Sequence, residues 1–295
     1  MGKQEKTGLV LEGGGMRGIY TAGVLDVFME HGIRFDGVMG VSAGAIHGCS
    51  YVSGQKGRSI RYYKQYCRDK RFISYRNLLR TGEMVGAQFC YHEIPEKLEP
   101  YDFDSFDKSG TEFYVTCSNV ETGKAEYLRV RDMRTQVDAM RASASLPLVS
   151  RIVEWEGKKL LDGACTDSVP YGAFHRMGFG RLVVVLTRHK GYVKKPKKSW
   201  MVEAMYRRYP RFVRAMRNRY KAYNRSIRRL EQLEAAGKIF VIRPSSPLKI
   251  SRMRATPEQL QKIYDIGSAD ARARLEEMKV WLGREKDDRE SIGDL

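Results

Sequence analysis

The chain begins with two short apolar runs separated by a segment of helical spacing. Residues 7–11 and 37–41 form the runs, and residues 18–30 place apolar side chains three and four positions apart before Gly32. Short apolar runs predict buried strands, and the spacing between them predicts a helix. A strand, a helix and a strand in this order predict a right-handed parallel crossover.

The same patterns continue along the chain. Further strands are expected at 112–118, 125–130, 181–187 and 238–242, and further helices at 58–67, 135–145, 200–233 and 257–282. This alternation is typical of the α/β class. Because no repeat or Gly/Ser linker divides the chain, we expect a core over 1–190 and a basic helical extension over 191–295 that completes the same domain. The only candidate for a flexible boundary is 194–198.

Glycines crowd the loop after the first run. Gly13, Gly15 and Gly18 match G-x-G-x-x-G, the fingerprint of a dinucleotide-binding turn in which backbone N–H groups approach a pyrophosphate. The same geometry suits any oxyanion. A dinucleotide site also needs an acid at the end of the second strand. Here Asp36 precedes that strand and Ser42 follows it, which disfavours a nucleotide.

A serine follows the second run in Gly40-Val41-Ser42-Ala43-Gly44. The pattern G-x-S-x-G places a serine on a sharp turn between a strand and a helix, where flanking glycines relieve crowding. A serine hydroxyl is a weak nucleophile and needs a base within hydrogen-bond reach. The sequence therefore predicts a nucleophilic Ser42 with a base from elsewhere in the chain.

Two kinds of base could serve Ser42. A Ser-His-Asp arrangement would use His175 or His189, but an α/β-hydrolase normally builds more of its sheet before the elbow. The other candidate is Asp162, which ends an apolar run and would need dry surroundings to raise its affinity for the proton. An Asp-Gly pair is also a common turn. His47 falls on another face of the helix after Ser42 and is expected to be a packed side chain.

Together, the three motifs resemble those of the bacterial patatin-like phospholipase family, which has a G-G-G-x-R/K-G loop, a serine elbow and a D-G-A/G aspartate. This chain matches them at 13–18, 40–44 and 162–164. The resemblance runs from residue 7 to about 185. It includes Ala144-Ser145-Leu146-Pro147, which is similar to the family's small-residue segment ahead of a proline. It departs at Ser168, where many members have Asn. It implies a single three-layer α/β domain with a mostly parallel central sheet and flanking helices.

The resemblance also implies roles for individual residues. Ser42 would be the nucleophile and Asp162 its base. The oxyanion hole would comprise Gly13, Gly14, Gly15, Met16, Arg17 and Gly18, with the N–H groups of Gly14, Gly15 and Met16 as donors. The two turns would be supported by Gly40, Gly44, Gly163 and Ala164.

The activity that the resemblance implies is a serine acyl hydrolase of the phospholipase A or lysophospholipase type, without a metal or organic cofactor. Two alternatives remain open from the residues alone. One is a Ser-His-Asp carboxylesterase. The other is a non-catalytic module that binds an anionic surface or a nucleic acid.

Charge adds a further expectation. The formal net charge is +18, and residues 188–229 contain sixteen Lys or Arg against one acid, Glu203. Apolar residues within 209–230 recur three and four positions apart, which predicts a basic amphipathic helix. We expect its apolar stripe to pack on the domain and its cations to contact an anionic membrane surface. A nucleic acid is the less favoured partner.

The compartment follows from what the sequence contains few of. Five cysteines form no C-x-x-C pair, which argues against a zinc site and a disulfide framework. No run approaches the ~18 apolar residues of a membrane span, and the start of the chain has no signal-peptide core. We expect a cytoplasmic protein that can lie on the inner face of a membrane.

Overall fold

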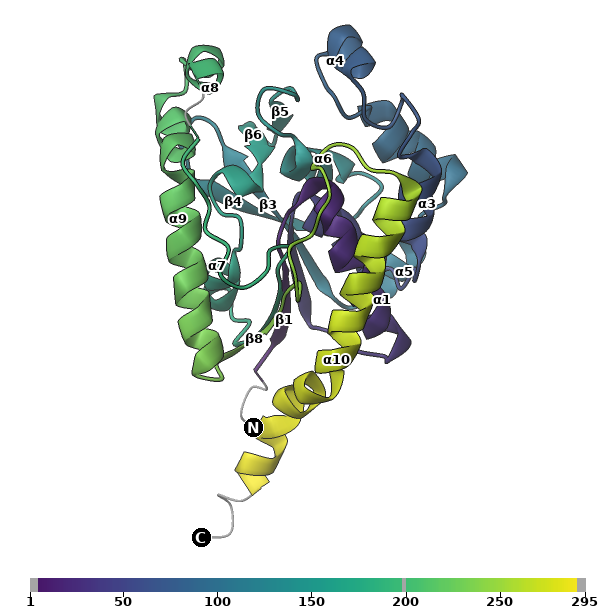
Figure 1. The fold of residues 1–295 in the computed structure, drawn as a ribbon, viewed down its shortest axis with the longest axis vertical. Coiled ribbons are helices and arrows are strands. Elements are labelled where there is room, and N and C mark those ends of the chain that lie inside the picture. The colour runs from purple at the N-terminus through teal and green to yellow at the C-terminus, as the bar shows by residue number, and fades with distance from the viewer. Residues whose placement is uncertain (1–4, 198–199, 291–295) are drawn as a thin grey trace.

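The computed structural model describes residues 5–197 and 200–290, with side chains in the last helix described as far as Gly283. Among these residues eight strands form one central sheet (Figure 1). Its order is β5 (Val153–Trp155), β6 (Lys158–Asp162), β3 (Glu112–Asn119), β2 (Gly37–Val41), β1 (Thr7–Leu11), β7 (Arg181–Val185) and β8 (Ile239–Ile242), with β4 (Ala125–Val130) paired to β3.

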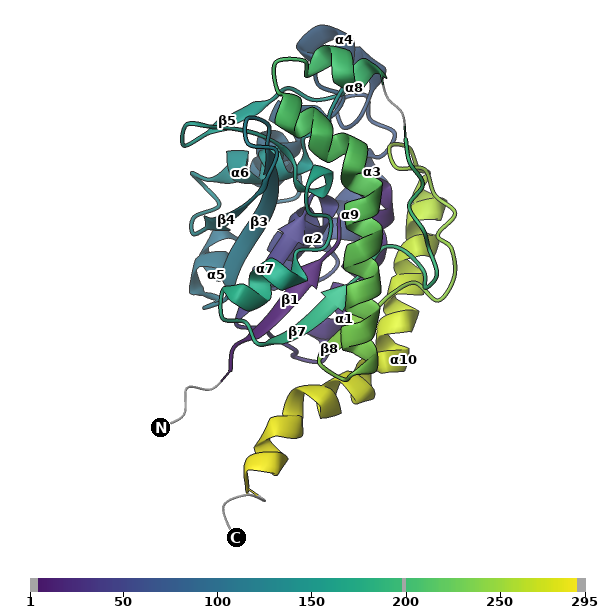
Figure 2. The same cartoon turned by 90° about the vertical axis from the view of Figure 1, so that its left-hand side faces the viewer.

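The pairing of strands divides the sheet into two parts. The five strands β3, β2, β1, β7 and β8 are parallel, whereas β4 and β6 run antiparallel to β3, and β5 runs antiparallel to β6. The carboxyl ends of the parallel strands point to the same end of the molecule. In Figures 1 and 2 this is the upper end.

Helices cover both faces of the sheet and complete three layers. They are α1 (Ile19–Glu30), α2 (Ala43–Val52), α3 (Arg58–Tyr66), α4 (Tyr75–Thr81), α5 (Phe103–Lys108), α6 (Val137–Ala144), α7 (Tyr171–Arg176), α8 (Trp200–Met205), α9 (Pro210–Ala235) and α10 (Pro257–Glu290), with a π-helical segment at Phe89–Leu98. Figure 1 shows α9 and α7 on one side and α1 and α10 on the other.

Alternation along the strands explains why both faces are covered. Leu9 and Leu11 join the apolar cluster that includes α1 and α10, and Val10 joins the cluster that includes α7 and α9. Successive side chains of a strand point to opposite faces, so a strand that is apolar throughout needs a layer on each face. The predicted α/β class and the helices on both sides of a mostly parallel sheet are confirmed.

The C-terminal helix α10 packs closely on α1. A Cβ added to Gly23 would lie 2.2 Å from the Tyr264 carbonyl oxygen, and one added to Gly267 would lie 2.1 Å from the Tyr20 carbonyl oxygen. The Tyr264 hydroxyl also donates to Asp26 at 2.7 Å. Glycine on both helices thus permits an approach that a side chain would block. None of the described helices is long and apolar enough to cross a membrane.

The single helix predicted at 200–233 is wrong: α8 and α9 are separate helices. Tyr209 has an extended backbone (φ −124°, ψ 65°), and Pro210 is the first residue of α9. A proline disfavours helical geometry in the residue before it and fits the first turn of a new helix. The expected flexible boundary at 194–198 is also partly fixed, because Lys194 N–H donates to the Asn224 side chain at 2.9 Å. Lys198 lies outside the described residues.

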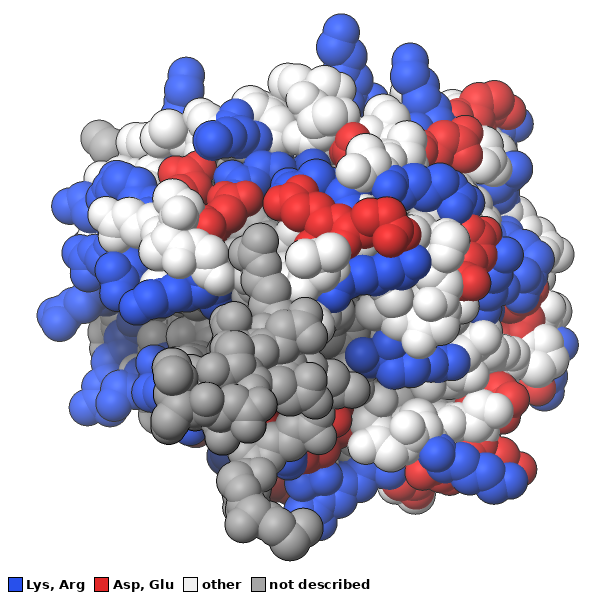
Figure 3. All heavy atoms as spheres, turned by 90° about the horizontal axis from the view of Figure 1, so that it is seen from below, with Lys and Arg blue, Asp and Glu red and all other residues white. Residues whose placement is uncertain are grey.

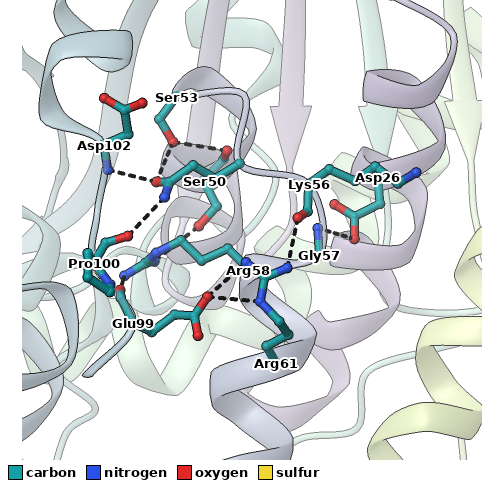
Figure 4. Close-up of polar contacts among 11 residues, drawn as sticks. Asp26, Ser50, Ser53, Lys56, Gly57, Arg58, Arg61, Glu99, Pro100 and Asp102 are labelled. Atoms are coloured by element: carbon teal, nitrogen blue, oxygen red, sulfur yellow. Dashed lines mark hydrogen bonds and ion pairs between the residues drawn. The ribbon is translucent and has the colours of Figure 1, made fainter. Parts of the chain in front are cut away.

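A polar network fixes the connection between α2 and α3 (Figure 4). The guanidinium of Arg58 donates to the Glu99 carbonyl at 2.8 Å, and Arg61 donates to the Glu99 carboxylate at 2.8 Å. On the other side, Gly57 N–H donates to Asp26 at 3.0 Å. The network therefore holds the start of α3 beside the site described next.

Candidate active site

Ser42 occupies the sharp turn between β2 and α2. Its backbone has φ 55° and ψ −124°, a region that costs roughly 1–3 kcal/mol for a residue other than glycine. The turn is held by the Ser42 N–H, which donates to the Ser143 hydroxyl at 2.9 Å. Added Cβ atoms would lie 2.3 Å from Ala45 at Gly40 and 2.4 Å from the Leu11 carbonyl at Gly44. Both glycines are therefore required by close packing around the elbow.

Asp162 reaches the same place from the opposite direction. Residues 113–116 of β3 pair with both β2 and β4, and Cys117 and Ser118 pair with both β4 and β6. A strand has two edges, so β2 and β6 share the edge that β4 leaves free. Val41 pairs with Thr116 and Asp162 pairs with Cys117. The carboxyl ends of β2 and β6 therefore meet head to head, with Ser42 following one and Asp162 ending the other.

The carboxylate of Asp162 is held on one side only. Its Oδ1 accepts from the Ala164 N–H at 2.8 Å, whereas its Oδ2 is buried and has no hydrogen-bond partner among the described residues. Asp162 itself is 1% exposed. A Cβ on Gly163 would lie 2.1 Å from the Thr116 carbonyl, so glycine is needed for β6 to end here. One carboxylate oxygen thus has a hydrogen-bond partner, and the other, also buried, has none among the described residues.

The glycine loop lies against the elbow. A Cβ on Gly13 would lie 3.0 Å from the Cβ of Ser42, and one on Gly18 would lie 2.6 Å from the Cβ of Ala43. Gly14 packs on Thr187, where an added Cβ would be 3.1 Å from the hydroxyl oxygen. Gly15 has φ +58°, which suits glycine. The structure therefore brings the motif at 13–18 and the motif at 40–44 into contact.

One N–H of this loop is occupied. Met16 N–H donates to the Arg252 carbonyl at 3.0 Å, and a Cβ on Gly15 would lie 2.4 Å from the same oxygen. Arg252 belongs to residues 243–256, which connect β8 to α10 and rise past the end of β1 in Figure 1. An acyl oxygen that used this N–H would have to displace the Arg252 carbonyl.

A buried carboxylate anchors the loop from below. Glu12 accepts from the Thr187 N–H at 2.7 Å and from the Tyr223 hydroxyl at 2.9 Å. This ties the end of β1 to the end of β7 and to α9. Burial, together with the negative charge of Glu12 and this hydrogen bond, raises the pKa of Tyr223 above its ordinary value, so the hydroxyl stays a donor.

An apolar cavity of about 160 Å³ adjoins Ser42. Its lining comes from α2, α3, the segment around Phe72–Val85, the π-helical segment Phe89–Leu98 and α6, and it includes Ile46, Tyr62, Phe72, Val85 and Met140. Arg252 lines it as well. The cavity has the lining expected of a site for an apolar ligand with a few polar groups near its mouth.

The candidate histidines lie in other surroundings. His47 is 1% exposed, as expected for a packed side chain, and its Nδ1 lies 3.0 Å from the Ser59 hydroxyl. Burial lowers the pKa of His47 to about 3. His175 lies on α7, and the Nδ1 of His189 is 2.7 Å from the Lys190 carbonyl. Among the described residues none of the three hydrogen-bonds to Ser42.

Several residues at the site carry no motif and were not predicted. Ser143 bridges Ser42 N–H to the Thr116 carbonyl, to which its hydroxyl donates at 2.7 Å. Glu12, Thr187 and Arg252 act through contacts between distant segments. The only sequence pattern close to any of these residues is the small-residue segment that begins at Ala144, next to Ser143. Within the described residues, no group of three or more His, Cys, Asp or Glu side chains could hold a metal ion.

Comparisons with known proteins show which sequences and structures this chain resembles. A family model described as patatin-like phospholipase matches residues 9–175, and one described as a domain of unknown function matches 209–283. The chain is 28% identical to the uncharacterized protein YjjU of Escherichia coli K12 over 88% of this chain and 74% of that protein. It is 30% identical to lysophospholipase nte1 of Aspergillus niger over 60% of this chain, which spans 11% of that protein. VipD from Legionella pneumophila aligns with a TM-score of 0.45 at 13% identity over 92% of this chain and 67% of VipD.

Proposed function

Because the family model matches residues 9–175, which make up more than half of this chain, the chain belongs to the patatin-like phospholipase family, and we propose that it is a serine acyl hydrolase. It cleaves fatty-acyl esters of phospholipids or lysophospholipids. The observation that carries this proposal is the head-to-head meeting of β2 and β6. In this arrangement a strained Ser42 follows β2, and β6 ends at a buried Asp162 whose Oδ2 has no hydrogen-bond partner among the described residues.

The proposed reaction uses a Ser-Asp pair. Asp162 accepts the proton of Ser42 as the serine oxygen attacks the ester carbonyl. Asp162 then returns the proton to the departing alcohol and leaves an acyl-enzyme. A water molecule, deprotonated by the same carboxylate, releases the fatty acid and restores Ser42. Each proton is taken and returned at one carboxylate oxygen.

The glycine loop stabilises the negative charge on the attacked carbonyl oxygen. The N–H groups of Gly14 and Gly15 are the proposed donors, and Met16 N–H joins them when the Arg252 carbonyl is displaced. Loss of one such donor typically lowers turnover by ~100- to 1,000-fold. Gly13, Arg17 and Gly18 shape this loop. The acyl chain occupies the apolar cavity beside Ser42.

Labelling with a fluorophosphonate tests the nucleophile. The reagent is expected to form one adduct that mass spectrometry maps to Ser42. Ser42→Ala should lose both the adduct and lysophospholipid hydrolysis. The matched control is Ser245→Ala, which removes a hydroxyl on the distant segment after β8. An adduct at another residue, or full hydrolysis by Ser42→Ala, would refute the proposal.

A second pair of variants separates the dyad from a triad. If His175 or His189 were the base, His175→Asn or His189→Asn would abolish hydrolysis. The Ser-Asp proposal expects both variants to retain it. His175 lies near the start of β1 and β7, at the other end of the parallel strands from Ser42. The Nδ1 of His189 lies 2.7 Å from the Lys190 carbonyl.

The upper end of the molecule is proposed to contact an anionic membrane. Helices α4 and α8 both lie at this end in Figures 1 and 2 and expose large apolar side chains, with Leu79 at 87% and Trp200 at 76% exposure. The apolar stripe of α9 packs on the domain through Phe212, Tyr223 and Leu230, and its outer face carries exposed cations at Arg211, Arg214, Lys221, Arg225 and Arg228. Figure 3 shows Lys and Arg along the left margin, on the α9 side, with few acidic side chains.

Vesicle sedimentation tests this contact. Binding should be stronger to vesicles that contain phosphatidylglycerol than to pure phosphatidylcholine, because each Lys or Arg near an anionic surface contributes ~1 kcal/mol. Trp200→Ser should weaken binding about tenfold, since a buried apolar side chain contributes ~1.5–3 kcal/mol. Val280→Ser, at an exposed valine of α10, is the control. Equal binding to both vesicles would refute the anionic contact. The cytoplasmic location stays a prediction.

A further inference from the structure

Five cationic side chains converge beside the candidate active site from four separate segments. Arg17 lies in the glycine loop, Arg188 and Lys194 follow β7, Arg219 lies on α9, and Arg252 precedes α10. All but Arg17 lie outside the 9–175 match. The group, called the cation cluster below, is therefore assembled mainly by the later part of the chain.

Several contacts place the cluster against the site. Arg219 Nε donates to the carbonyl of Ala164, two residues after Asp162, at 2.5 Å. The backbone carbonyl of Arg252 accepts from the Met16 N–H. Burial, followed by the charge of Arg219, lowers the pKa of Arg252, and the nearby charge of Asp162 partly opposes this lowering. Arg252 also lines the cavity that contains Ser42.

Aromatic rings support the other two members. Lys194 Nζ lies 3.9 Å from the centre of the Tyr223 ring, and the Arg188 guanidinium lies 4.1 Å from the centre of the Tyr192 ring. The two rings are 6.1 Å apart. Tyr223 is also the donor to Glu12, so these cations sit directly above the anchor of the glycine loop.

Negative charge at the site does not balance the cluster. None of the five side chains forms an ion pair with a described carboxylate. Glu12 is engaged by Thr187 and Tyr223. The Nε of Arg17 is buried without a hydrogen-bond partner among the described residues, and Arg17 is 7% exposed. Buried charges are normally paired, so this arrangement leaves donors for an anion that the described part of the chain does not supply.

Burial and then repulsion from neighbouring cations lower the pKa of two members of the cluster. Burial, followed by the charges of Arg188 and Arg252, lowers the pKa of Arg17 to about 10. Burial, followed by the charge of Arg219, lowers the pKa of Lys194 to about 7. A bound anion would relieve both effects.

We propose that the cation cluster is a subsite for the phosphate of the substrate headgroup, close to Ser42, with Arg252 at the point where the cluster meets the apolar cavity. The proposal rests on the proposed function, since the phosphate belongs to the lipid whose ester Ser42 cleaves. Arginine forks and a lysine ammonium are the groups that proteins use for phosphate oxygens, and such charge-assisted hydrogen bonds are strong. The subsite distinguishes phosphate-bearing acyl esters from neutral ones.

Substrate preference tests the subsite. The measurement is kcat/KM for monomeric short-chain lysophosphatidylglycerol divided by kcat/KM for the monoacylglycerol with the same acyl chain. In the double variant Arg188→Gln/Lys194→Gln this ratio should fall ~10- to 100-fold, because a hydrogen bond to a charged group contributes ~1.5–3 kcal/mol. The control Lys108→Gln/Lys124→Gln removes the same charge from exposed positions. An unchanged ratio, or an equal fall in the control, would overturn the proposal.

Calorimetry with inorganic phosphate separates this proposal from the proposed function. If the wild-type protein hydrolyses neither ester, the proposed function fails, and phosphate binding that is lost in the double variant still supports an anion site. No phosphate binding in that case refutes the subsite as well. If phosphate binds but the substrate ratio does not change in the double variant, the cluster takes free phosphate and not the lipid headgroup.

Discussion

The apolar cavity beside Ser42 and the cation cluster come from different parts of the chain and meet at Arg252. The cavity is lined mostly by residues of the 9–175 match, from α2, α3 and α6. The cluster comes mainly from residues 188–252, which fall in the gap after that match and in the 209–283 match. Ser42, the proposed nucleophile, therefore adjoins a surface suited to hydrocarbon, and the proposed phosphate subsite lies next to that surface.

This difference suggests that the early part of the chain carries the proposed reaction and the later part determines substrate preference. Ser42, Asp162 and the glycine loop all belong to the first part of the chain, so the proposed reaction needs the later part only for support. Glu12 shows what that support is, because its carboxylate bonds to Thr187 and to Tyr223 on α9. We therefore expect changes in the early part to alter turnover and changes in the later part to alter substrate preference.

The largest effect is expected at the proposed base. Asp162→Asn keeps the size of the side chain and an oxygen for the Ala164 N–H, but it cannot accept the serine proton. Turnover should fall ~100- to 10,000-fold, the range for general acid–base catalysis. Stopped assays of fatty-acid release from lysophosphatidylglycerol measure it.

Asp167→Asn is the matched control. Asp167 lies five residues further on and accepts from the Tyr127 hydroxyl at 2.9 Å, a bond that Asn can keep. Equal turnover in Asp162→Asn and the control would remove Asp162 from the mechanism. It would also remove the division between the two parts of the chain.

The next effect is expected in the glycine loop. A Cβ on Gly13 would lie 2.8 Å from the Val41 carbonyl and 3.0 Å from the Cβ of Ser42. Gly13→Ala should therefore push the loop away from the elbow and lower kcat ~100- to 1,000-fold, as for loss of an oxyanion donor. Gly172→Ala is the control, because its nearest atom would be the Arg176 side chain at 3.6 Å. A Gly13→Ala protein with normal kcat would place the oxyanion elsewhere.

The sequence predicted the parts of the site better than their assembly. The sequence made Ser42 and the glycine loop candidates through local turn patterns, and it made Asp162 a candidate through the family resemblance, because an Asp-Gly pair alone is a common turn. It could not show that β6 runs against β3 and meets β2 head to head, since strand pairing over such separations leaves no local pattern. The α/β class was predictable from alternating periods. The break at Pro210 could also have been read from the proline itself.

Residues that act through distant contacts gave no signal. Arg252 lies in a segment without helical or strand periodicity, and its position over the loop depends on where β8 and α10 place that segment. The π-helical segment at Phe89–Leu98 contains Pro95, which argues against a helix on sequence grounds. Tertiary packing decides such segments.

The apolar cavity should determine which acyl-chain length the protein prefers. Val85 is partly exposed and lines the cavity, so Val85→Phe should fill part of it. The ratio of kcat/KM for long-chain over short-chain esters should fall about tenfold, since differences of one or two methylenes are worth ~1–3 kcal/mol. Val280→Phe makes the same change at an exposed site on α10 and should leave the ratio as it was. An unchanged ratio in Val85→Phe would place the acyl chain outside this cavity.

The smallest expected effect is a pH dependence of the substrate preference that the cation cluster produces. Burial, then the nearby charge of Arg219, lowers the pKa of Lys194 to about 7. The ammonium is charged below this pH and loses its proton above it. The groups that face it are Arg219, Arg252, Arg188, Glu12 and the Tyr223 ring. Preference for lysophosphatidylglycerol over the monoacylglycerol should therefore be greatest below about pH 7 and fall above it.

The fall should be roughly threefold, less than a full charged hydrogen bond, because the bound phosphate itself favours the ammonium form. A phosphodiester keeps a single charge across this range, and effects on the Ser42 reaction cancel in the ratio. Lys194→Arg stays charged at every pH used and should remove the slope while keeping the preference. Lys194→Gln should remove both. If the slope persists in both variants, another group titrates, and the pH dependence of the cation cluster does not come from Lys194.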